Sequence, residues 1–129
     1  MKVQKQVRWL LPYLESVSDL IPARKIRALK GYKVSAKKYA QQYGSCVKEH
    51  NGQFTINMRL YRYDEVSKVY LSFYLGHLLE TFAHELSHCI EWNHTPRHIK
   101  YTGIILSRFA KVLKKQGITD TYKNRMKYE

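Results

Sequence analysis

His84, Glu85 and His88 form the sequence HExxH, the pattern with the clearest chemistry in this chain. On a helix, residues four apart lie one turn apart on the same face, so both imidazoles can bind one zinc ion at about 2.0–2.1 Å. Glu85 then reaches a water on that metal without being a ligand, takes its proton and later passes it to the leaving amine. The motif therefore predicts zinc-dependent hydrolysis of an amide bond, with Glu85 as general base.

A catalytic zinc site has three protein ligands and keeps its fourth position for water. His94 follows His88 by six residues, which gives the pattern HExxH-x5-H. We expect the helix to end near Glu91, and a turn at Trp92-Asn93 would then return His94 to the metal. Three histidines would complete such a site.

Two further polar residues lie beyond this turn. His98, the other candidate for the third ligand, stands at the start of the next expected helix, where it could instead position a ligand or stabilise the developing oxyanion. Tyr101 is a rival for the oxyanion role. The spacing alone leaves these alternatives open.

The remaining histidines and the two cysteines have simpler interpretations. His77 precedes His84 by seven residues and shares its helix face, but a packed or exposed histidine is expected there rather than a ligand. His50 falls in a hairpin loop and is expected to be solvated. Cys89 points about 100° away from its neighbouring ligand, so we interpret it, and Cys46, as small core residues.

Alternation of polar and apolar residues marks one strand clearly. Apolar side chains at every second position of 54–60 fall on one face, as in a half-buried strand. Asn51-Gly52 just before it is a strong hairpin signal. We therefore expect 45–49 to pair with 54–60.

Helical spacing predicts helices over 3–20, 64–90 and 99–115. Pro12 interrupts the first, and Ile21-Pro22 ends it. Asp64 is expected to cap the long helix, and Ser35 is expected to cap a further helix over 35–43 that ends at Gly44. Gly117 should end the last helix, and 119–129 is expected to be a polar tail.

Composition describes one domain with a strongly basic surface. The chain has 129 residues, 44% of them apolar, which suits a folded domain and excludes a largely disordered one. The sequence has no run of 18 apolar residues, so no membrane span is predicted. Two cysteines make no disulfide framework, and a cytoplasmic location is expected. We expect one α+β domain over 1–129, with a helical basic region over 1–33, a catalytic core over 34–116 and a polar tail over 117–129.

Lys and Arg number 23 against 10 Asp and Glu, which gives a formal charge of +13. This surplus suggests an anionic partner, with a merely solvated basic surface as the alternative. The cluster over 24–38 and a side of the last helix with Arg108, Lys111, Lys114 and Lys115 are candidates for a phosphate-binding groove. No base-reading motif is visible, so any nucleic-acid binding should be largely independent of sequence.

Four segments together resemble a known family, the YgjP-like metallopeptidase domain. They are Tyr43-Gly44-Ser45-Cys46, the stretch 52–60 (GQFTINMRL), His84-Glu85-Leu86-Ser87-His88 and Asn93-His94-Thr95-Pro96-Arg97-His98. The resemblance covers about residues 34–113 and implies a minimal zincin, a small antiparallel sheet against an active-site helix. By matching position it implies zinc on His84, His88 and His94 and the base at Glu85, and it argues against His98 as a ligand.

The sequence departs from the family pattern in three places. Tyr43 replaces the usual Trp, His98-Ile99 replaces Phe-Trp, and 61–79 is longer than the family's link, either as a specificity insert or as a longer helix. The related SprT-like proteases, associated with DNA–protein crosslinks, and the metzincins, which have Gly where this chain has Glu91, fit less well.

Three functions follow as hypotheses. The first is a zinc metallopeptidase acting on protein or peptide. The second is a basic DNA- or RNA-binding module with a structural or vestigial zinc site, which His84, His88, His94 and His98 would close. The third is hydrolysis of another substrate such as a phosphate ester. Glu85 favours catalysis, because a structural site needs no carboxylate there.

Overall fold

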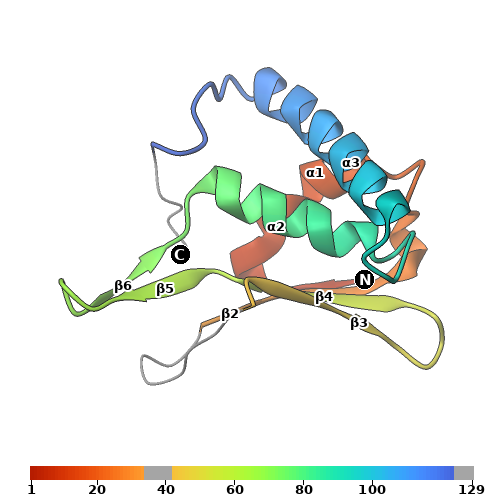
Figure 1. The fold of residues 1–129 in the computed structure, drawn as a ribbon, viewed down its shortest axis with the longest axis horizontal. Coiled ribbons are helices and arrows are strands. Elements are labelled where there is room, and N and C mark those ends of the chain that lie inside the picture. The colour runs from red at the N-terminus through yellow and green to blue at the C-terminus, as the bar shows by residue number, and fades with distance from the viewer. Residues whose placement is uncertain (34–41, 124–129) are drawn as a thin grey trace.

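A mixed four-stranded sheet and three α-helices make up an α+β fold, seen in a computed structural model that describes residues 1–33 and 42–123 (Figure 1). In chain order the elements are β1 (Lys2–Val3), the 3₁₀ helix η1 (Lys5–Leu10), α1 (Leu11–Glu15), the 3₁₀ helix η2 (Ala23–Lys25), β2 (Ile26–Tyr32), β3 (Gly44–Lys48), β4 (Phe54–Arg59), β5 (Tyr61–Asp64), β6 (Val69–Ser72), α2 (Leu75–Ser87) and α3 (Pro96–Lys115).

The predicted hairpin is confirmed as β3 and β4. The two strands pair antiparallel from Gly44 opposite Met58 to Lys48 opposite Phe54, and Gly52 in the connecting turn has a φ of 83°. The four apolar side chains predicted to share a face are all buried: Phe54, Ile56, Met58 and Leu60. Period-two patterning therefore identifies this strand and its inward face.

The rest of the sheet differs from the expected antiparallel one, because β1 and β2 join it in parallel. The strand order is β1-β2-β4-β3, with β2 parallel to both β1 and β4. The region 1–33 was expected to be helical, but it also contributes the two strands β1 and β2. A register shift between Ile26 and Ala28 breaks the alternation in β2, so its apolar residues do not follow a period of two.

The helix expected over 64–90 is also wrong in its first part. Residues 61–72 form a second, two-stranded sheet of β5 and β6, and α2 begins only at Leu75. Asp64 does not cap a helix; its carboxylate accepts hydrogen bonds from the backbone N–H and the hydroxyl of Ser67 in the hairpin turn. The long 61–79 stretch is therefore a hairpin followed by the first turns of α2, not a longer helix.

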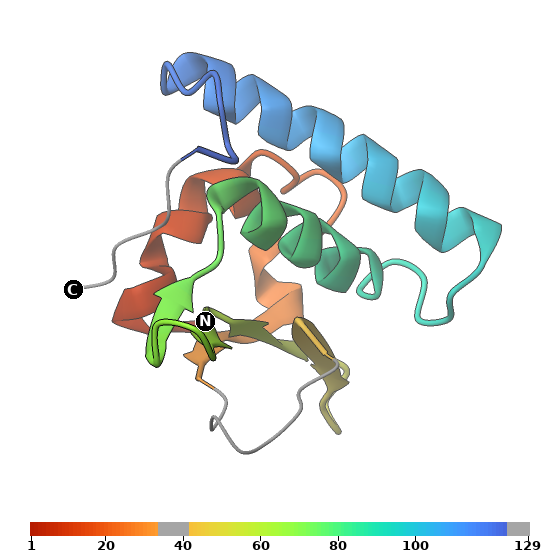
Figure 2. The same ribbon diagram turned by 60° about the vertical axis from the view of Figure 1, so that its left-hand side comes forward.

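The helices stack on one face of the sheet. α2 lies between the sheet and α3, which forms the outermost layer (Figures 1 and 2). Phe82 of α2 stacks on Phe109 of α3 at 5.8 Å, and Phe109 meets Tyr13 of α1 edge-on at 5.4 Å. These rings and the inward face of β4 form the core that fixes α2 in place.

The helix predicted over 99–115 is confirmed and starts slightly earlier, at Pro96. The expected break at Ile21-Pro22 is present as well, since α1 ends at Glu15 and η2 starts at Ala23. Gly44 does not end a helix but starts β3, and most of the helix expected over 35–43 lies outside the described residues.

The tail is ordered as far as the structure describes it. The backbone N–H of Gly76 donates to the Thr121 carbonyl at 2.9 Å, and the Tyr122 hydroxyl donates to Glu80. The first part of the predicted polar tail thus packs against the start of α2; residues 124–129 lie outside the described part. Among the described helices, none combines the length and apolar character needed to cross a bilayer.

Candidate metal centre

The last turn of α2 carries the HExxH motif. His84 and Glu85 lie in the helix, Ser87 is its last residue, and His88 is the helical C-cap with φ −65° and ψ −21°. Because His88 keeps helical dihedrals, it still lies one turn beyond His84, and the two ring centroids are 5.0 Å apart. The helix ends slightly before the expected Glu91, with turns over 88–90.

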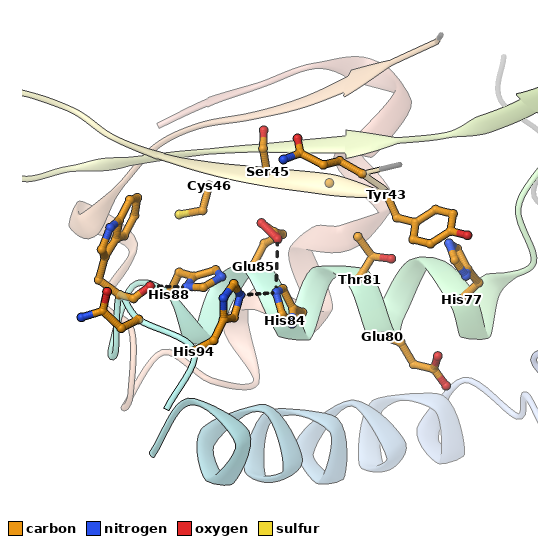
Figure 3. Close-up of a pocket in the computed structure, with 14 residues that line it drawn as sticks. Tyr43, Ser45, Cys46, His77, Glu80, Thr81, His84, Glu85, His88 and His94 are labelled. Carbon is orange, nitrogen blue, oxygen red and sulfur yellow. Dashed lines mark hydrogen bonds and ion pairs between the residues drawn. The ribbon is translucent and has the colours of Figure 1, made fainter. Parts of the chain in front are cut away.

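The loop between α2 and α3 returns His94 to this end of α2, as the turn at Trp92-Asn93 predicts. The Thr95 hydroxyl donates to the Glu91 carboxylate at 3.2 Å and accepts from the His98 backbone N–H at 3.3 Å, so it both braces the loop and caps α3. The Nε2 of His94 lies 3.2 Å from the Nε2 of His84 (Figure 3).

One ring nitrogen from each of His84, His88, His94 and His98 lies within 4.8 Å of the other three. Two imidazole nitrogens on one tetrahedral zinc ion should lie about 3.3 Å apart, which the 3.2 Å separation of His84 and His94 fits. These four residues can therefore hold a metal ion.

Hydrogen bonds fix which nitrogen two of the rings present. The Nδ1–H of His88 donates to the Trp92 carbonyl at 2.7 Å, so its Nε2 keeps a lone pair for a metal. The Nε2–H of His98 instead donates to the His84 carbonyl at 3.0 Å. That carbonyl is among the last of α2, where helix geometry leaves acceptors unpaired.

His98 is thus a buried link between α3 and α2, with only 2% of its surface exposed. Its Nε2–H is donated to the His84 carbonyl, so Nδ1 is the nitrogen that it can present to a metal, whereas His88 presents Nε2 and the Nε2 atoms of His84 and His94 lie 3.2 Å apart. His98 is the buried member of the cluster, and all four histidines remain within reach of one ion.

The Glu85 carboxylate lies beside the histidines and faces β3 (Figure 3). Its Oε1 is 3.8 Å from the Nε2 of His84, and only 6% of the residue is exposed. Burial raises the pKa of Glu85 to about 7, because a carboxylate loses hydration in this position. A carboxyl group with a pKa near neutrality is suited to accept and return a proton.

His84 and His88 are held in their neutral forms, which metal binding requires. Burial, with the neighbouring charges of His98, His88 and His94, lowers the pKa of His84 to about 4. Burial also lowers the pKa of His88, against the opposing effect of its bond to the Trp92 carbonyl.

A cavity of about 950 Å³ opens next to the histidines. One wall is α2 with His77, Thr81, His84 and Glu85; the other is the start of β3 with Tyr43, Gly44, Ser45 and Cys46. A Cβ on Gly44 would lie 2.8 Å from the Cγ2 of Thr81 and 3.3 Å from the Cγ of Glu85. The strand therefore passes close to the helix at the position of the candidate base, and only glycine fits there.

Other candidate residues have different surroundings. Tyr101 is half-buried on α3 beneath the Arg97 guanidinium, 5.5 Å from its ring centre, and it is not among the cavity-lining residues. His77 lies at the far end of the cavity, stacked on Phe73 at 4.3 Å and edge-on to Tyr43 at 4.5 Å. It is a packed histidine, as expected, and the exposed His50 lies in the hairpin turn.

Cys46 and Cys89 pack against the core, as expected, and both are free thiols. The hydrogen bond between the Cys89 and Cys46 thiols, followed by burial, raises the pKa of Cys89. The wall formed by β3 was not foreseen as part of the site. The sequence predicts the β3–β4 hairpin, but no local pattern indicates that β3 lies against the HExxH helix.

Comparison of the chain with protein-family models, with curated proteins and with solved structures gave no match. The interpretation of the site therefore depends on its own geometry.

The buried carboxylate should cost stability in the metal-free protein, and Glu85→Gln should remove that cost. A raised folded-state pKa means that folding favours the protonated acid, so stability falls as pH rises from 4.5 toward about 7. The free energy of unfolding of metal-free Glu85→Gln should exceed that of the parent by an amount that grows by about 2–3 kcal/mol from pH 5 to pH 8. Denaturant unfolding at both pH values measures this; an equal difference at the two pH values would contradict it.

Proposed function

We propose that the protein is a zinc-dependent peptidase in which His84, His88 and His94 hold the metal and Glu85 is the general base. The observation that carries the proposal is a cluster of histidine ring nitrogens within 4.8 Å of one another, with the buried Glu85 carboxylate 3.8 Å from the Nε2 of His84. Zinc is the ion favoured by three imidazoles, and it supplies a Lewis acid and a water whose pKa is lowered toward about 7.

Glu85 does the proton transfer in this proposal. Its Oε1 stands 3.8 Å from the Nε2 of His84, near enough to reach a water on a metal held by that nitrogen. Burial keeps its proton affinity high until a cation arrives, and a nearby positive charge then favours the ionised, proton-accepting form. The same carboxyl returns the proton to the leaving amine.

A peptide is the substrate class that the cavity wall fits best. β3 is an edge strand of the described sheet, and the hydrogen bonds at Tyr43–Arg59 and Glu49–Gln53 set the ladder so that Gly44 and Cys46 turn their backbone groups away from β4. An extended peptide can add to this edge by backbone hydrogen bonds and pass between β3 and the metal site. A phosphate ester would make no use of such an edge.

The architecture is compatible with the zincin-like fold that the resemblance to the YgjP-like domain implies. An HExxH helix lies against a sheet whose edge strand borders the cavity (Figures 1 and 3). The sheet is mixed rather than antiparallel, and the β5–β6 hairpin is an addition to the family's short link. We therefore propose the zincin relationship on the helix and edge strand.

A structural metal site is the second candidate, because a fourth histidine lies within reach. His98 could close the shell through its Nδ1, because its Nε2–H is already donated to the His84 carbonyl. A closed site would leave the buried Glu85 carboxylate beside the metal without a function. Glu85 therefore favours the open, three-histidine site.

The proposed activity is tested with a complex peptide library. The zinc-loaded protein is incubated with the library and newly formed amino termini are identified by mass spectrometry. We expect internal cleavages that disappear with a chelator and return with zinc. Zinc-loaded Glu85→Gln is the matched control, and equal cleavage by that variant, or none by the parent, would contradict the proposal.

The close passage of β3 over α2 gives a further prediction. In Gly44→Ala the new methyl would overlap Thr81, so β3 must shift outward at the cavity, at a cost of about 1–3 kcal/mol in unfolding free energy and with lower peptidase activity. Thr81→Ser removes the overlapping Cγ2, so the double variant should recover part of both losses. Unfolding curves and cleavage rates of the four proteins measure this. An unchanged Gly44→Ala would show that the strand is not held at this distance.

A further inference from the structure

The outward face of α3 combines lysines with small side chains and has no acidic residue. None of the 20 residues of α3 is Asp or Glu. Successive residues of an α-helix are about 100° apart around its axis. Four exposed residues therefore lie within about 100° of one another, in one stripe on the side opposite the buried Phe109: Lys100, Ser107, Lys111 and Lys114. α3 is also the outermost layer of the fold, so this stripe faces away from the sheet (Figure 2).

Ion pairs within the fold do not neutralise the stripe. Arg108 turns inward and makes two hydrogen bonds to Asp19, at 2.9 and 3.0 Å, and Arg97 pairs with Glu91 at 3.5 Å. None of the ion pairs found among residues 1–33 and 42–123 involves the three stripe lysines. Arg108 was expected beside Lys111 and Lys114 on one side of α3, but it is paired with Asp19 instead. Lys111 and Lys114 remain free to bind an external anion.

We infer that this stripe, defined by Lys100, Lys111 and Lys114, binds the phosphate backbone of double-stranded nucleic acid without reading its sequence. Lys100 and Lys114 lie about 21 Å apart along the helix, a length over which a duplex presents about 12 phosphate charges. Gly103, Ser107 and other small residues between the lysines let a backbone approach the helix closely. No side chain of the stripe is suited to read a base edge, apart from the lysines themselves.

An anionic membrane fits this face less well than a nucleic acid. Interfacial helices bury an apolar face in the bilayer. The apolar face of α3 is already used, since Ile105 and Phe109 are buried against the rest of the protein. Ile99, at one end, is the large apolar residue that α3 exposes. Attraction would thus be purely electrostatic, which favours a partner of high linear charge density.

The stripe and the cavity lie on opposite sides of α2. β3 and the cavity border one side of that helix and α3 the other (Figure 3). A nucleic acid on α3 would leave the cavity open, so this inference stands apart from the proposed peptidase activity.

The test compares two variants that lose the same charge. Lys100, Lys111 and Lys114 are changed to Gln in one; Lys5, Lys48 and Lys68, which are exposed outside α3 and outside the cluster over 24–38, are changed to Gln in the control. Binding of a fluorescent 25-base-pair duplex is titrated over a range of salt concentrations. We expect the stripe variant to bind at least tenfold more weakly at low salt and its log–log salt slope to shrink by about 3, with the control close to the parent.

Three results would overturn the inference: no duplex binding by the parent at low salt, equal losses in both variants, or binding of the parent to anionic vesicles but not to duplex. Circular dichroism confirms that each variant is folded. If the triple variant does not fold, Lys111→Gln alone should reduce the slope by about 1 against Lys48→Gln, and an unchanged slope would contradict the inference.

Discussion

His94→Ala should abolish tight zinc binding, whereas His98→Ala should leave it nearly intact. His94 presents its Nε2 3.2 Å from that of His84, and removing a ligand should weaken zinc binding more than the roughly 10–100-fold typical of a residue that only positions one. His98 is not a ligand in the proposed site, so its loss should weaken zinc binding by about tenfold, the low end of that range. Competition with a chromophoric chelator measures both affinities.

His98→Ala should instead appear as a loss of fold stability. The side chain is buried, and its removal leaves a cavity and an unpaired carbonyl, together worth about 2–4 kcal/mol. His77→Ala is the control, because His77 lies on α2 away from the cluster, and this variant should keep full zinc affinity. If His98→Ala empties the site while His94→Ala does not, the assignment of the ligands is wrong.

Glu85→Gln should bind zinc as the parent does and lose about 100- to 10,000-fold in peptide hydrolysis, because the amide is similar in shape but cannot accept the proton. The comparison is made on a peptide that the parent cleaves, under saturating zinc, with metal content measured in the same samples. Since Glu85 is not a ligand in the proposed site, its replacement separates metal binding from chemistry.

Glu80→Gln is a matched control for the loss of one carboxylate from the same helix. Glu80 is exposed and accepts a hydrogen bond from the Tyr122 hydroxyl; it lines the same cavity but is not part of the histidine cluster. It should retain most of the parent's rate. A Glu85→Gln variant as active as Glu80→Gln would remove Glu85 from the mechanism.

The local part of the site could be predicted from the sequence. HExxH places two histidines and a carboxylate by helix geometry alone, and the turn at Trp92-Asn93 brings His94 back, as expected. The β3–β4 hairpin followed from its alternation and from Asn51-Gly52. Each of these signals lies within a few residues of the feature it predicts.

The features that the sequence did not predict depend on distant contacts or on broken patterns. A bulge disrupts the alternation of β2, and its parallel pairing with β4 joins residues far apart in the chain. The strands β5 and β6 are short and mostly half-buried, so they show no clear alternation of buried and exposed residues, and the helix predicted over 64–90 wrongly included them. The role of His98 depends on how α3 docks on α2, which no local pattern encodes.

The most direct measurement of the central claim is a crystal structure of the zinc-loaded protein with anomalous data at the zinc edge. The account predicts one zinc peak bonded to the Nε2 atoms of His84, His88 and His94, with the fourth position open to the cavity and His98 still bonded to the His84 carbonyl. A shell closed by His98, or a zinc ion bound elsewhere, would contradict it.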